Sequence, residues 1–286
     1  MCCGRIAPDR RYYWTQTERQ RMIEAGRNTK LYTTRPYDQL EQEGRIGAMY
    51  LDYPRHLHDI LPSGSWYNRP CFILGGGESL KGFDYGILDG RLTIGTNKTL
   101  VAYEPTILYM MDVCFAQGAY DGNLDMAADP VKLSERWRNT RSRKVMLSPM
   151  NQYTLPGDDV WLVRRLLQKK VFLDIKEGIY GGTNSGFGAM MLAVALGANP
   201  VFLLGMDMKA VHSTHCHAGY DDRTIAEFNN KLTEFKQDFI EMTMPLDFVE
   251  KKVINLNTDA GTDLHCFPVV DPEAFFKRKV YNGRSI

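Results

Sequence analysis

The densest group of titratable side chains in the sequence lies between residues 207 and 217, in the segment DMKAVHSTHCH. His215 and His217 alternate there, so on an extended segment their side chains would face the same way. A histidine titrates near neutral pH and can therefore act as a general base or a general acid. We predict His215, His217 and Asp207 as catalytic residues that handle a proton.

A metal site is the alternative interpretation of the same cluster. Asp207 or Asp221 would add a carboxylate oxygen to the histidine nitrogens, and thiols are available from Cys216 and from the pair His265 and Cys266. The spacing matches no regular zinc motif, so acid–base chemistry is favoured over a metal.

A glycine-rich loop follows a short apolar run in CFILGGGESLKGFDY, residues 71–85. It is not a dinucleotide fingerprint, whose third glycine position falls on Leu80, and it is not a P-loop, because Phe83 follows Gly82. A strand, a glycine turn with accessible N–H groups and Ser79 near a helix start still suit a phosphate or diphosphate oxygen. The alternative is a tight turn without a ligand.

A second loop of small residues, GGTNSGFGAMM at 181–191, precedes a dense apolar stretch. Exposed N–H groups at a helix start favour a negative partner. Thr183, Asn184 and Ser185 can also bond sugar hydroxyls or the edge of a base. An ordinary helix cap would explain the same residues.

These loops follow apolar runs that alternate with helical stretches from residue 70 onward. The expected strands are CFILG, RLTIGTN, PTILYMMD, KVMLSP, KKVFLDI, NPVFLLGMDM and KVINLN. The expected helices are DDVWLVRRLLQ, TNSGFGAMMLAVALGA and DDRTIAEFNNKLTEFKQDFIEMTMPL. This rhythm predicts an α/β fold with a doubly wound, mostly parallel Rossmann-like sheet over residues 66–286. Residues 1–65 are predicted as a helical or irregular N-terminal extension.

Ligands of open α/β sheets bind outside the carboxyl ends of the strands. The polar residues after each apolar run are therefore predicted to share one crevice. The expected nucleotide or donor contacts are Gly75, Gly76, Gly77, Ser79, Asn97, Asp112, Thr183, Asn184, Ser185 and Gly186. Asp112 and Asp207 are the candidate metal ligands.

Composition argues against several classes of protein. The 35 Lys and Arg residues balance 34 Asp and Glu residues, so nothing attracts nucleic acid or anionic membrane in general. The sequence contains no apolar stretch long enough to span a membrane and no secretory signal, and its six cysteines lack the spacing of a disulfide framework. We expect a cytoplasmic protein. We expect the basic, aromatic segment RRYYWTQTERQRMIEAGRNTK to pack on the main body or on a neighbouring subunit of a homo-oligomer, or else to contact nucleic acid.

FILGGGESLKGFDY resembles the opening strand and loop of glycosyltransferase family 42, the bacterial sialyltransferases. It resembles equally a group of uncharacterised proteins, many from phages, to which archaeal 6-hydroxymethylpterin diphosphokinases are related. The resemblance continues through IGTN, LYMMD, TNSGFGAMMLAVALGANPVFLLGMDM, THCH and VINLNTDAGTDLHCFP, and covers residues from about 70 to 270. It implies a GT-A-like variant of the sheet.

The resemblance also implies a function. Gly75, Gly77, Ser79, Asn97, Ser185 and Gly186 would contact a nucleotide sugar or nucleotide diphosphate, and His215 would be the general base toward a hydroxyl acceptor. Glu78 stands where the family has proline, and Asp112 stands where it has an amide. Both changes imply a cation, Mg²⁺ or Mn²⁺, between carboxylate and phosphate.

The implied acceptor is a glycan, a small alcohol or a modified DNA base, and the implied setting includes a phage-infected bacterium. The alternatives are a metal-dependent diphosphokinase that acts on a small alcohol and a non-catalytic phage or structural protein that retains the fold.

Overall fold

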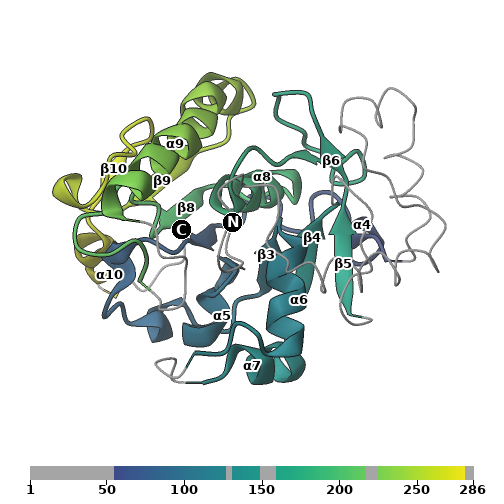
Figure 1. Cartoon of the computed structure of the whole chain (residues 1–286). Helices are drawn as coiled ribbons and strands as arrows, with labels where there is room; N and C mark the ends of the chain where they lie inside the picture. The colour runs from purple at the N-terminus through teal and green to yellow at the C-terminus, as the bar shows by residue number, and fades with distance from the viewer. Residues whose placement is uncertain (1–54, 127–130, 149–158, 217–223, 281–286) are drawn as a thin grey trace.

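The computed structural model describes residues 55–126, 131–148, 159–216 and 224–280 (Figure 1). Its centre is an eight-stranded sheet in the order β10-β9-β8-β1-β2-β3-β4-β5. Each pair of neighbouring strands is parallel. The strands are β1 (Cys71–Leu74), β2 (Leu92–Thr96), β3 (Ile107–Met110), β4 (Arg143–Leu147), β5 (Val160–Val163), β8 (Val201–Leu204), β9 (Val253–Leu256) and β10 (Val269–Val270). A separate pair joins β6 (Arg165–Leu166) to β7 (Ile179–Tyr180).

The strand order reverses at β1. The chain runs outward from β1 to β5 and later returns to place β8 on the other side of β1. Such a switch point opens a crevice at the carboxyl ends of the two strands, where open α/β sheets bind their ligands. The polar loops after β1 and β8 meet at this crevice.

Helices cover both faces of the sheet (Figure 1). α8 (Ser185–Ala195) and α9 (Ile225–Phe248) lie over one face, while α5 (Thr99–Ala102), α6 (Val113–Asp121) and α7 (Leu133–Asn139) lie over the other. The remaining elements are α4 (Leu57–Ile60), α10 (Pro272–Val280) and the 3₁₀ turns η1 (Glu78–Leu80), η2 (Tyr85–Leu88) and η3 (Asp259–Gly261).

Side chains of neighbouring residues in β1 are buried on opposite faces of the sheet. Cys71 and Ile73 belong to the core beneath α8 and α9, whereas Phe72 and Leu74 belong to a second core that includes Phe276 of α10. A strand buried on both faces reads as a continuous apolar run, as CFIL does. The predicted doubly wound parallel sheet is confirmed.

Helix α8 forms where the sequence predicted it. The side chain of Asn184 caps it by accepting a hydrogen bond from the N–H of Phe187 at 2.8 Å. After the last turn Gly197 adopts a φ of +97°, which favours glycine and ends the helix.

Two predicted elements are wrong. DDVWLVRRLLQ contains strand β5 rather than a helix, because Val, Trp and Leu at 160–163 suit a strand and the apolar run is too short to decide the period. KKVFLDI is irregular: Phe172 and Ile175 are buried, but Leu173 between them is half exposed, so the residues do not alternate as in a strand. KVINLN forms β9 as predicted, and the two-residue strand β10, which was not predicted, pairs with it at the sheet edge.

The last residues of the predicted extension contact the sheet. The N–H of Leu162 in β5 donates to the carbonyl of Arg55, and Leu57 is fully buried in the core. Residues 1–54 lie outside the described part, so the division at residue 65 stays a prediction. Within the residues that the structure describes, none of the helices is long and apolar enough to cross a membrane.

Candidate functional site

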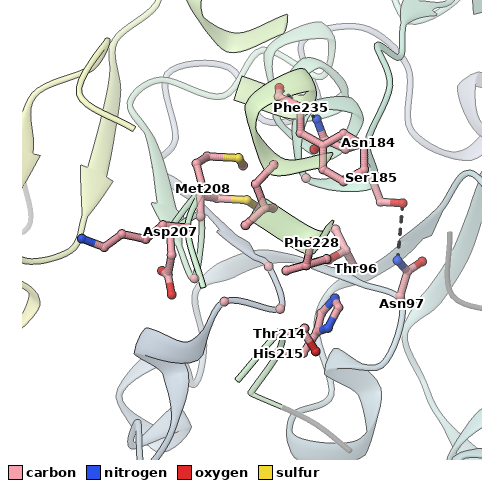
Figure 2. Close-up of a pocket in the computed structure, with 18 residues that line it drawn as sticks. Thr96, Asn97, Asn184, Ser185, Asp207, Met208, Thr214, His215, Phe228 and Phe235 are labelled. Atoms are coloured by element: carbon pink, nitrogen blue, oxygen red, sulfur yellow. Dashed lines mark hydrogen bonds between the residues drawn. The ribbon is translucent and has the colours of Figure 1, made fainter. Parts of the chain in front are cut away.

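A pocket opens at the switch point between β1 and β8 (Figure 2). Its walls come from segments far apart in the sequence, namely residues 75–77, 96–97, 184–186, 205–209 and 214–215, together with side chains of α9. Most of the predicted donor residues therefore converge. Ser79, Asp112 and Thr183 do not line the pocket.

The glycine loop (residues 75–79) packs on the loop after β8. The N–H of Gly75 donates to the carbonyl of Leu204 at 2.8 Å, and that of Gly77 donates to the carbonyl of Gly205 at 2.9 Å. A Cβ on Gly77 would lie 2.5 Å from Cγ of Asp207 and 2.6 Å from the carbonyl oxygen of Gly205. Gly75 and Gly77 thus permit two backbone loops to touch, and their N–H groups are already bonded within the protein.

Asp207 fixes the end of the glycine loop. Its carboxylate accepts hydrogen bonds from the N–H of Ser79 at 2.8 Å, from the Ser79 hydroxyl at 2.5 Å and from the amide of Asn257 at 2.8 Å. Burial raises the pKa of this carboxyl above its ordinary value, against the hydrogen bonds from Ser79 and Asn257, which lower it. Asp207 lines the pocket, but its carboxylate lies on the far side from His215 (Figure 2).

A second buried carboxylate fixes the loop before α8. Asp238 of α9 is 4% exposed and accepts from the N–H of Thr183 at 2.7 Å, from the Thr183 hydroxyl at 2.6 Å and from the Tyr180 hydroxyl at 3.2 Å. Thr183, predicted as a donor contact, is therefore bonded to the protein itself. The sequence analysis missed Asp238; an acidic residue between Phe235 and Phe239 on the apolar face of a helix was the available signal.

The start of α8 faces the pocket. Ser185 and Gly186 occupy the first two helical positions, whose N–H groups have no acceptor within the helix. The side-chain amide of Asn97, after β2, lies 3.5 Å from the Ser185 hydroxyl (Figure 2). Together with Thr96 and Asn184, these residues make one wall polar.

A second part of the lining, the apolar wall, adjoins the first, since the side-chain amide of Asn184 lies 3.4 Å from the carbonyl oxygen of Phe235. Phe228, Leu232 and Phe235 of α9 line the pocket one helical turn apart, next to Met206. The ring of His215 packs on Phe228 with a centroid distance of 4.7 Å (Figure 2). The pocket therefore presents both hydrogen-bonding groups and an apolar surface.

His215 lies on a short segment that crosses the glycine loop. We call residues 212–216 the histidine strap. Oε2 of Glu78 accepts from the N–H groups of His212 at 3.0 Å and Ser213 at 3.3 Å, and the carbonyl of Gly76 accepts from the N–H of Cys216 at 2.9 Å. Glu78 thus bonds to the strap, a role that the sequence analysis did not foresee.

These contacts lower the pKa of Glu78 from 4.5 to about 2, the largest cause being the hydrogen bond from the His212 N–H. The ionised carboxylate therefore stabilises the fold above pH 4.5, and this contribution is lost as the pH falls toward 2. We expect the urea midpoint of the wild type to fall more than that of Glu78→Gln between about pH 5 and pH 3. Parallel pH profiles of the two proteins would contradict this.

The described residues do not fit a metal ion. Nowhere in the ranges that the structure describes do three or more His, Cys, Asp or Glu side chains gather so that they could hold one. Both oxygens of Asp207 accept hydrogen bonds, and Asp112 caps α6 by accepting from the N–H of Cys114 at 2.8 Å. His217 and Asp221 lie outside the described residues. Metal binding by Asp112 and Asp207 stays a prediction, and no chemical step is derived from it.

Comparison of the chain with protein-family models and with curated proteins gave no match. The solved structure of the MAf glycosyltransferase from Magnetospirillum magneticum AMB-1 is similar in fold, with a TM-score of 0.50 and 14% sequence identity. The alignment covers 93% of this chain and 45% of that chain, so this chain spans less than half the length of the protein it matches. At this identity the likeness shows the fold alone.

Proposed function

We propose that the pocket binds a nucleotide-activated sugar and that the protein is a glycosyltransferase that transfers the sugar to a hydroxyl acceptor. The observation that carries the proposal is the meeting of a helix start, a polar wall, an apolar wall and a histidine in one pocket at the switch point. The fold shared with the MAf glycosyltransferase and the family 42 resemblance of residues 70–270 support it.

The phosphate of the donor would lie at the start of α8. Ser185 and Gly186 lie in the first turn of α8, where backbone N–H groups point out of the helix and can bind an anion. The helix dipole also favours a negative charge there. The glycine loop is the weaker choice, because the N–H groups of Gly75, Gly77 and Ser79 are bonded within the protein. This assignment moves the expected phosphate contact from the glycine loop to α8.

The two walls suit a molecule with a flat apolar face and a polar edge. Sugars and nucleobases both have this character, and Phe228 and Phe235 contribute apolar surface to the pocket. Asn97 and Ser185 on the polar wall can bond hydroxyl groups or the edge of a base.

His215 would take the proton from the acceptor hydroxyl as the hydroxyl oxygen attacks the anomeric carbon. In the same step the bond from that carbon to the phosphate oxygen breaks, and the phosphate keeps the electron pair. The amides at the start of α8 would stabilise the charge of the leaving phosphate. A diphosphokinase would need metal for its in-line transfer, which the described residues support less well.

A titration tests the proposal. Uridine, cytidine and guanosine mono- and diphosphates and their sugar conjugates would be titrated into the full chain by calorimetry, with and without Mg²⁺. Asn97→Ala and Ser185→Ala should each weaken the binding of the preferred nucleotide about tenfold, because each removes a hydrogen-bonding group from the pocket. Asn230→Ala, on the exposed face of α9, is the matched control and should bind as the wild type does. Absence of binding by every compound would refute the proposed function.

A further inference from the structure

Residue Glu78 follows the glycine loop's last glycine and is held in place on both sides. Before it, the N–H of Gly77 bonds to the carbonyl of Gly205, and after it, Ser79 bonds twice to Asp207. Leu80 is 4% exposed and anchors η1 in the core. The backbone that carries the Glu78 side chain therefore belongs to the rigid part of the fold.

The histidine strap has little structure of its own. None of residues 212–216 belongs to a helix or strand; His212 is exposed, and residues 213–216 are partly buried. Its packing contacts are those of Cys216 with the core that includes Phe276 and of His215 with Phe228. A segment outside the helices and strands is prone to local opening, so its position also depends on individual hydrogen bonds. The bonds to the glycine loop supply that restraint.

The restraints bracket His215. Glu78 accepts from the N–H groups of His212 and Ser213 on one side, and Gly76 accepts from Cys216 on the other. Between them the Ser213 hydroxyl donates to the carbonyl of His215 at 3.0 Å, which shapes the turn. Hydrogen bonds to an ionised carboxylate are roughly twice as strong as neutral ones, so Glu78 is the stronger of the two anchors.

We propose that Glu78 is a positioning residue for His215: its carboxylate fixes the histidine strap to the glycine loop and thereby sets the histidine against Phe228 in the pocket. Glu78 touches no reacting atom in this account. The inference rests on the proposed function only for the role of His215, since the anchoring of the strap is a property of the chain itself.

Three variants isolate the anchor. Glu78→Ala removes both hydrogen bonds, while Glu78→Gln keeps an oxygen that can accept them. Lys81→Ala removes the ion pair of 3.3 Å with the other carboxylate oxygen of Glu78 and leaves the strap contacts intact. Both side chains of that pair reach solvent, so its loss should change little.

Amide hydrogen exchange of the full chain measures the anchor without any substrate. Glu78→Ala should accelerate exchange in residues 212–216 about tenfold or more, and Glu78→Gln should accelerate it less, because its oxygen still accepts the two hydrogen bonds without the charge. Lys81→Ala should exchange within about twofold of the wild type. Unchanged exchange in Glu78→Ala would overturn the proposal, and so would equal acceleration in Glu78→Gln.

Turnover of the sugar nucleotide identified by titration gives the second measurement. Glu78→Ala should lower kcat about tenfold while the KM for the donor stays near its wild-type value, and Glu78→Gln should retain a higher kcat than Glu78→Ala. A raised KM with unchanged kcat would contradict a role through His215. If the wild type turns over no sugar nucleotide, the proposed function fails while the exchange experiment still decides whether Glu78 anchors the strap.

Discussion

Replacing Gly77 by alanine is expected to lower the free energy of unfolding by about 3 kcal/mol. The added methyl would lie within 2.6 Å of the Asp207 carboxylate and of the Gly205 carbonyl oxygen. Neither can move cheaply, because one is backbone and the other accepts hydrogen bonds from Ser79 and Asn257. The substitution therefore combines overpacking with the loss of hydrogen bonds to a buried carboxylate. Urea denaturation of the full chain measures it as a lower midpoint at unchanged slope.

Gly86→Ala is the matched control for this prediction. Gly86 is exposed in η2, and a Cβ there would meet only the Asp84 side chain, at 3.2 Å. Its effect on the free energy of unfolding should stay within about 0.5 kcal/mol. Equal midpoints for the two variants would show that the close contact between the loops after β1 and β8 does not stabilise the fold.

Replacing His215 by glutamine is expected to lower kcat by about 10²–10⁴-fold, the usual contribution of a positioned general base. Glutamine fills a similar volume and can pack on Phe228, so the fold and the affinity for the donor should persist. Steady-state turnover and calorimetric titration of the same preparation separate the two effects.

His212→Gln serves as the control for His215→Gln, because His212 lies on the same strap with an exposed side chain. It should retain wild-type kcat. A loss of donor affinity equal to the loss of kcat in His215→Gln would make His215 a binding residue rather than a base.

The sequence predicts the fold well where an element is long or buried on both faces. The strands in CFIL and NPVFLLG and the apolar helix after Asn184 are recognisable because each is a continuous apolar run, which is typical of an element buried on all sides. The strand at 160–163 and the irregular segment at 169–175 are not, because short apolar runs carry no reliable period and tertiary contacts decide their conformation.

The site is predictable in place but not in detail. The strand order alone brings the carboxyl ends of β1, β2 and β8 to one crevice, independently of which side chains follow the strands. A glycine that lets a ligand approach and a glycine that lets another loop approach look the same in sequence, and Gly77 proved to be the second kind. The bond of Thr183 to Asp238 joins residues 55 positions apart, which no local pattern encodes.

The most direct test of the account is a crystal structure of the full chain with the nucleotide that binds most tightly in the titration. We expect a phosphate oxygen within about 3 Å of the N–H groups of Ser185 and Gly186, with the nucleotide or its sugar between Asn97 and Phe228. A phosphate bound on the glycine loop, or a nucleotide bound outside the pocket between β1 and β8, would contradict it.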